Sequence, residues 1–101
     1  MSTEEEQFHS VGGSMTDAEK SQMFGKPCYK INKKAFVCFF HGAMVFKLTD
    51  EAHRDALSLD GAQLFDPSGK GRAMKEWVQV PFEYAEQWPG LAKAAFEYVG
   101  G

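Results

Sequence analysis

The sequence has few cysteines and no long apolar run. Cys28 and Cys38 are too few for a disulfide framework, and no Cys-x-x-Cys or Cys/His spacing indicates a zinc site. No stretch reaches the roughly 20 apolar residues that a membrane helix needs, and the acidic residues 1–6 do not fit a secretory signal. These absences predict a cytoplasmic protein with reduced thiols and no membrane segment.

Carboxylates are missing from the middle of the chain. Although the 101 residues have a net charge of -3, residues 20–49 contain no Asp or Glu. The same stretch contains six lysines: Lys20, Lys26, Lys30, Lys33, Lys34 and Lys47. Such a stretch can present a positive face to an anionic partner. The alternative is that the lysines occupy exposed hairpin positions and prevent strands from pairing at an open edge.

Aromatic and β-branched residues dominate residues 36–40 and 43–48, which predicts two strands. Asn32-Lys33 and His41-Gly42 fit two-residue hairpin turns, so we expect a three-stranded antiparallel meander that begins at Cys28. In this register Ile31 pairs with Lys34 and Phe40 with Ala43, while Cys28 lies opposite Val37. The two cysteines then point to opposite faces of the sheet. One predicted face holds Cys28, Val37, Phe39, Met44, Phe46 and Leu48, and the other holds Tyr29, Ile31, Phe36, Cys38, Phe40 and Val45.

The flanking segments predict helices around further strands. A capping box at Ser2 and Glu5 predicts a short helix through Phe8 toward Val11, and the glycines that follow predict a frayed or irregular segment up to Ser21. Residues 49–51 begin a second helix, residues 63–65 and 74–80 form strands, and Pro89 begins a closing helix.

The element order is therefore α-β-β-β-α-β-β-α. It predicts an α+β fold of two layers, with an antiparallel sheet and helices on one face. We expect residues 1–22 to be a partly disordered acidic segment with a short helix, and residues 23–101 to form the domain.

A combination of motifs resembles the N-terminal domain of the TfoX/Sxy family. The segments are Met23–Pro27, Met44–Leu48, Gly61–Pro67, and Lys70–Met74 ahead of Trp77–Pro81, within roughly residues 20–100. The resemblance implies a fold like that of secretion chaperones and YjbR-like proteins, and it implies no enzyme. Larger family members, linked to regulation of DNA uptake, have a second C-terminal domain. Asn32-Lys33 stands where the family usually has Asn-Gly.

No residue pattern indicates catalysis. His9, His41 and His53 are scattered and lack the context of a triad, so His41 is interpreted as a turn residue and His53 as a solvated helix position. Cys28 has no neighbouring base and is interpreted as a packing residue. The loop Ser68–Arg72 lacks the spacing of a phosphate-binding loop and is interpreted as a hairpin loop with a basic tip. We expect no enzyme, cofactor or metal site.

Two binding hypotheses follow, and an enzyme of unknown class is the remote third alternative. The first is a regulatory module that contacts a protein partner or a second copy of itself through a partly exposed apolar face that includes Tyr29, Phe36 and Phe40. Alternatively, the N-terminal segment or residues 82–88 cover this face. The second hypothesis is a nucleic-acid-binding module, with Tyr29 or Phe36 available for stacking. Its candidate contacts are Lys26, Lys30, Lys33, Lys34, Lys70 and Arg72.

Overall fold

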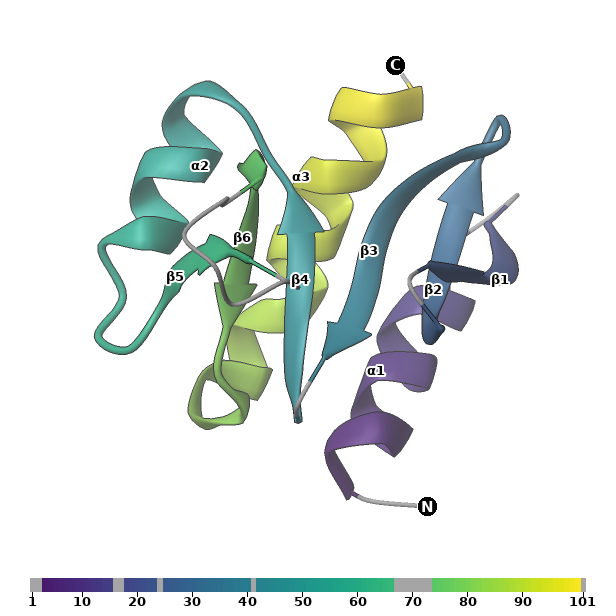
Figure 1. Ribbon diagram of the computed structural model, residues 1–101, viewed down its shortest axis with the longest axis horizontal. Coiled ribbons are helices and arrows are strands. Elements are labelled where there is room, and N and C mark those ends of the chain that lie inside the picture. Colours follow the sequence, from purple (N-terminus) through teal and green to yellow (C-terminus); the bar gives the residue numbers. More distant parts are fainter. Residues whose placement is uncertain (1–2, 16–17, 24, 41, 67–73, 101) are drawn as a thin grey trace.

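A computed structural model describes residues 3–15, 18–23, 25–40, 42–66 and 74–100, which form three α-helices and six strands (Figure 1). The elements are α1 (Thr3–Gly13), β1 (Glu19–Met23), β2 (Lys26–Ile31), β3 (Lys34–Phe40), β4 (Ala43–Lys47), α2 (Asp50–Leu57), β5 (Gln63–Phe65), β6 (Met74–Val80), the 3-10 helix η1 (Phe82–Gln87) and α3 (Trp88–Gly100). Within these ranges no helix has the length and apolar character needed to cross a bilayer.

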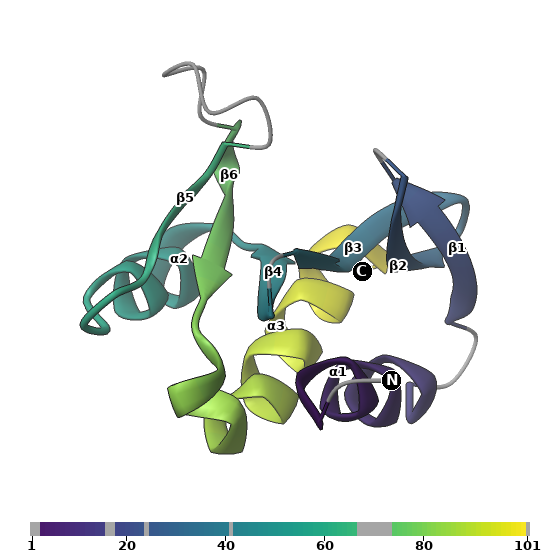
Figure 2. The ribbon, with the colours of Figure 1, turned by 60° about the horizontal axis from the view of Figure 1, so that its bottom comes forward.

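The six strands form one sheet in the order β1-β2-β3-β4-β6-β5, and every neighbouring pair is antiparallel. After β4 the chain passes through α2 to the edge strand β5 and returns as β6 between β4 and β5. Figure 2 shows α1 and α3 on one side of the sheet, whose two ends curve away from these helices. The α+β class and the antiparallel sheet are therefore confirmed.

The first predicted turn has the expected backbone. Asn32 and Lys33 have φ angles of 52° and 67°, the left-handed conformation that a two-residue hairpin turn of this kind requires. Ile31 consequently pairs with Lys34, and in the next hairpin Phe40 pairs with Ala43, as the sequence predicts. His41 lies outside the described residues.

The predicted pairing of Cys28 with Val37 is wrong because β3 contains a bulge. Val37 lies opposite Tyr29 and Ala35 lies opposite Lys30, so Phe36 is an extra residue in β3. Phe36 and Val37 both pack on the helix side of the sheet. The bulge brings Cys28 directly opposite Cys38, and both thiols are buried and free. The prediction that the cysteines point to opposite faces is therefore also wrong.

Apolar side chains are buried on both faces of the sheet, in clusters of unequal size. The helix-side core includes Phe8, Tyr29, Ile31, Phe36, Val37, Met44, Phe46, Leu48, Val78 and Trp88. The other cluster, here called the second-face cluster, consists of Cys28, Cys38, Val45, Phe65 and Trp77, with Ala35 and Phe40 packed against it. The bulge reverses the facing of the β2 side chains relative to residues 37–40 of β3. Tyr29 and Ile31 therefore lie on the helix side of the sheet, opposite to the face predicted for them.

The N-terminal residues join the same core. Phe8 is fully buried and Val11 is 4% exposed, so α1 is an integral part of the helical layer. The helix continues through Gly12 and Gly13, beyond the predicted end. Glu19–Met23 form the edge strand β1 against β2, although the sequence predicts a frayed or irregular segment up to Ser21. The order of elements therefore has one more strand before β2 than the sequence predicts.

Candidate functional site

Four of the six basic residues predicted to contact an anion lie in the described part of the chain. Lys26 and Lys30 belong to β2, Lys33 lies in the following turn and Lys34 begins β3. Lys26, Lys33 and Lys34 are exposed, and Lys30 is partly buried. Lys70 and Arg72 lie outside the described residues.

The sheet brings Lys26 and Lys30 to its helix-free face. Lys26, Cys28 and Lys30 are every second residue of β2, so their side chains point to the same face of the sheet. Cys28 belongs to the second-face cluster, which places both lysines on that face. The Lys26 ammonium lies 5.9 Å from the centre of the Phe40 ring, within range of a cation–π contact. Burial raises the pKa of the Cys28 thiol, and the nearby charge of Lys30 partly opposes this effect. Lys30 therefore lies close enough to act on the second-face cluster.

The remaining lysines of this region are divided between the two faces. Lys34 pairs with Ile31, whose side chain lies in the helix-side core, so Lys34 does not join Lys26 and Lys30. It lines a pocket of about 180 Å³ with Lys47, Tyr98 and Val99. Lys47 is the last residue of β4 and pairs with Trp77 of β6.

Charge is segregated between the two layers. Among the described elements, the three α-helices and η1 carry nine carboxylates against two basic side chains, Arg54 and Lys93. The six strands carry six lysines against two carboxylates, Glu19 and Glu76. Glu76 accepts a hydrogen bond from the Tyr98 hydroxyl of α3. The strand layer is therefore basic, although the whole chain is acidic.

The residues predicted to form an exposed partner face are mostly buried. Tyr29 is 6% exposed and Phe36 is fully buried, both in the helix-side core, and Phe36 packs edge-on against Phe96 at a ring separation of 5.5 Å. Their predicted exposure is therefore wrong, because the bulge and the reversed β2 place them under the helices. Phe40 alone lies on the second face, where it is partly buried beside Phe65.

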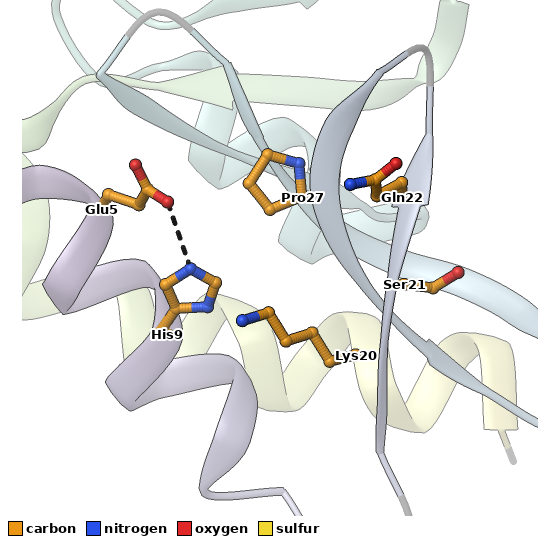
Figure 3. A pocket seen from close by; sticks show the side chains of 6 residues that line it. All are labelled: Glu5, His9, Lys20, Ser21, Gln22 and Pro27. Atoms are coloured by element: carbon orange, nitrogen blue, oxygen red, sulfur yellow. Dashed lines mark hydrogen bonds and ion pairs between the residues drawn. The ribbon is translucent and has the colours of Figure 1, made fainter. Parts of the chain in front are cut away.

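A polar pocket that the sequence reasoning missed lies between α1 and the β1–β2 hairpin (Figure 3). It has a volume of about 460 Å³, and its lining residues are Glu5, His9, Lys20, Ser21, Gln22 and Pro27. His9 Nδ1 lies 3.0 Å from the Tyr29 hydroxyl, and His9 Nε2 lies 3.4 Å from a Glu5 carboxylate oxygen. In Figure 3 the Lys20 side chain extends toward the His9 ring.

Both ring nitrogens of His9 contact protein groups. With the proton on Nε2, the ring donates to Glu5 and accepts at Nδ1 from the Tyr29 hydroxyl. Burial raises the pKa of Tyr29, which keeps its phenol protonated as a donor. The contact between His9 and Tyr29 links α1 to β2. Because both ring nitrogens are engaged, His9 must break its contact with Tyr29 or Glu5 before it can exchange a proton with a bound molecule.

The i, i+4 spacing of Glu5 and His9 on a predicted helix was the only sequence signal for this site. Lys20 could not be placed beside them, since β1 was not predicted.

His53 does not line this pocket. His53, interpreted from sequence as solvated, donates from Nε2 to the backbone oxygen of Lys75 at 2.6 Å and so links α2 to β6. His41 is outside the described residues. Within the described ranges, no group of three or more His, Cys, Asp or Glu side chains has an arrangement suited to a metal ion.

Comparisons with protein-family models, with curated proteins and with solved structures found no match for this chain. The resemblance to the TfoX N-terminal domain therefore depends on the sequence motifs alone.

Proposed function

We propose that this protein is a non-enzymatic binding module that contacts nucleic acid through the helix-free face of its sheet. The observation that carries the proposal is that Lys26 and Lys30 lie together on the face of the sheet opposite the helices, whereas the described helices carry nine carboxylates against two basic side chains. Phosphates would contact Lys26 and Lys30, with Lys33 at the adjacent turn. The acidic helical layer would repel the same ligand and so fix which face it meets.

The spacing along β2 suits a chain of phosphates. Lys26 and Lys30 are four residues apart on one face of a strand, about 13 Å along its axis, which equals about four base-pair steps along the axis of a B-form duplex. Phe40, partly buried between Lys26 and Phe65, offers an aromatic surface to a base. A base on Phe40 would free Lys26 from its ring contact to reach a phosphate.

This proposal replaces the first hypothesis, in which the apolar face contacts a protein partner or a second copy of the chain. Self-association depended on an exposed apolar second face, and Tyr29 and Phe36 are buried beneath the helices instead. As part of the same proposal, we assign the protein to the cytoplasm and to the TfoX N-terminal-like fold, on the motifs quoted above. The competence role of the larger family members is not included.

Titration of labelled single- and double-stranded oligonucleotides, followed by fluorescence anisotropy at several salt concentrations, tests the proposal. Three lysine contacts should give a log–log salt slope of about -2 to -3, and the double variant Lys26→Glu/Lys30→Glu should reduce its magnitude by about 1.4 to 1.8. Lys93→Glu makes the same type of charge change on α3 and should leave the slope unchanged.

Lack of binding to either oligonucleotide at low salt would contradict the proposal. A loss in the helix variant of about half that in the strand double variant would do the same, because equal loss per unit of charge would indicate a response to total charge. Binding of polyglutamate without binding of oligonucleotides would identify an acidic protein as the partner and would also refute it.

A further inference from the structure

A groove between α2 and α3 combines an apolar floor with an acidic rim. It has a volume of about 450 Å³. Ala52 of α2 and Leu91 and Ala94 of α3 form the floor, and all three are partly exposed while packing against the helix-side core. Asp55 and Glu86 border it from α2 and η1 and are exposed. The two alanines of the floor leave room for a side chain from another molecule.

Gly90 lines this groove, and neither close packing nor an unusual backbone conformation requires a glycine there. Nothing lies within 4 Å of the place that a Cβ would occupy at Gly90, and its backbone does not have a positive φ. Within a helix, glycine is less favourable than alanine by up to about 1 kcal/mol. Gly12 of α1 differs, because a ring of the core lies against it. The groove thus contains an empty position that neither packing nor backbone geometry requires.

The charges at the groove select a cationic occupant. Among the residues that the structure describes, the lining contains Asp55 and Glu86 and no basic residue. Asp50 and Glu51 add acidity at the start of α2, and the nearby Arg54 has its guanidinium 3.6 Å from the Glu51 carboxylate. An anionic ligand would be repelled here, and a small inorganic cation would not use the apolar floor.

We infer that the groove binds a basic amphipathic peptide segment of another protein. One apolar side chain of the segment would rest on Ala52, Leu91 and Ala94, and flanking Lys or Arg side chains would reach Asp55 and Glu86. This surface belongs to the helical layer, so it is separate from the sheet face proposed to contact nucleic acid. A nucleic acid and such a peptide can therefore occupy the protein together.

The test uses the full chain and an amphipathic helical peptide built from leucine and lysine, with a matched leucine–glutamate peptide as control. Anisotropy of the labelled peptides gives affinities, and backbone amide shifts locate the site. We expect the lysine peptide alone to bind, with the largest shifts in α2, η1 and the first half of α3. Gly90→Met should fill the groove, and Asp55→Lys/Glu86→Lys should reverse its rim. Each should weaken binding by about tenfold or more.

Glu97→Lys, which lies on α3 outside this groove, is the matched charge control and should change the affinity by less than about twofold. The inference is overturned if neither peptide binds, if both bind equally, or if Gly90→Met binds as the unchanged protein does while remaining folded by circular dichroism. If Gly90→Met does not fold, the Asp55→Lys/Glu86→Lys variant decides the result. Sedimentation that shows self-association lost in the groove variants would identify a second copy as the occupant and would also refute the inference.

Discussion

Replacing Gly12 with alanine is a direct test of how closely α1 packs on the sheet. A Cβ at this position would lie 2.3, 2.6 and 2.9 Å from three ring carbons of Tyr29. The ring has little freedom to move, because Tyr29 is 6% exposed, its hydroxyl contacts His9 and its ring centre lies 5.4 Å from that of Phe8. Either the helix or the ring must therefore shift.

Three contributions set the expected size of the effect. Overpacking of a core position costs about 1 to 3 kcal/mol, and loss of the contact between His9 and Tyr29 adds about 1 kcal/mol. Better helix propensity offsets this by up to about 1 kcal/mol. We expect Gly12→Ala to lower the free energy of unfolding by about 1 to 3 kcal/mol, which for a domain of this size lowers Tm by about 5 to 14 °C.

The assay is thermal and urea unfolding followed by circular dichroism, with Gly13→Ala as the matched control. At Gly13 the nearest atom is the Tyr29 hydroxyl oxygen at 3.7 Å, an ordinary contact, so this variant should gain a few tenths of a kcal/mol. In a Tyr29→Ala background, Gly12→Ala should no longer destabilise, because the ring is gone. If both alanines stabilise the protein equally, the close approach of α1 to Tyr29 is refuted.

Two further outcomes follow from buried and bonded side chains. Burial, and to a smaller extent the nearby Cys28, raises the pKa of the Cys38 thiol from 9.0 to about 12. The folded state therefore favours the protonated thiol, and this contribution to the free energy of unfolding is complete below pH 9 and is lost as the pH rises toward 12. Between pH 9 and 12, the free energy of unfolding measured in urea should fall less for Cys38→Ala than for the unchanged protein. Equal decreases would contradict a raised pKa of Cys38. His53→Ala removes the hydrogen bond to the Lys75 carbonyl and should cost about 0.5 to 1.5 kcal/mol in thermal unfolding. Arg54→Ala, which breaks an exposed ion pair, should cost less than about 0.5 kcal/mol, and a ranking in the opposite order would show that His53 does not hold α2 to β6.

Local signals explain why the sequence predicts much of the fold. Asn32 and Lys33 determine a turn through their own backbone, so the pairing of Ile31 with Lys34 follows without knowledge of the rest of the chain. The helix beginning at residues 49–51 and the closing helix are likewise indicated by residues within them. Element type and turn register are therefore readable where adjacent residues determine them.

The errors arise where distant residues decide. The bulge at Phe36 has no glycine or proline to signal it, and it places both Phe36 and Val37 in the helix-side core. The edge strand β1 lacks an alternating apolar pattern and pairs through its backbone with β2. These two features determine the faces of Lys26 and Lys30 and the pocket beside His9. The candidate site was thus predictable in composition but not in arrangement.

The separation of charge has a consequence for the protein's electrostatics in solution. The molecule measures 25 Å along its shortest axis, whereas ions screen a charge over about 8 Å at physiological salt. An approaching molecule therefore experiences the sign of the nearer layer, and the net charge of -3 describes neither side. At neutral pH and low ionic strength the protein should be retained by both cation- and anion-exchange resins, each binding it in the opposite orientation. In this respect it acts as an electric dipole whose two poles are the sheet and its helices.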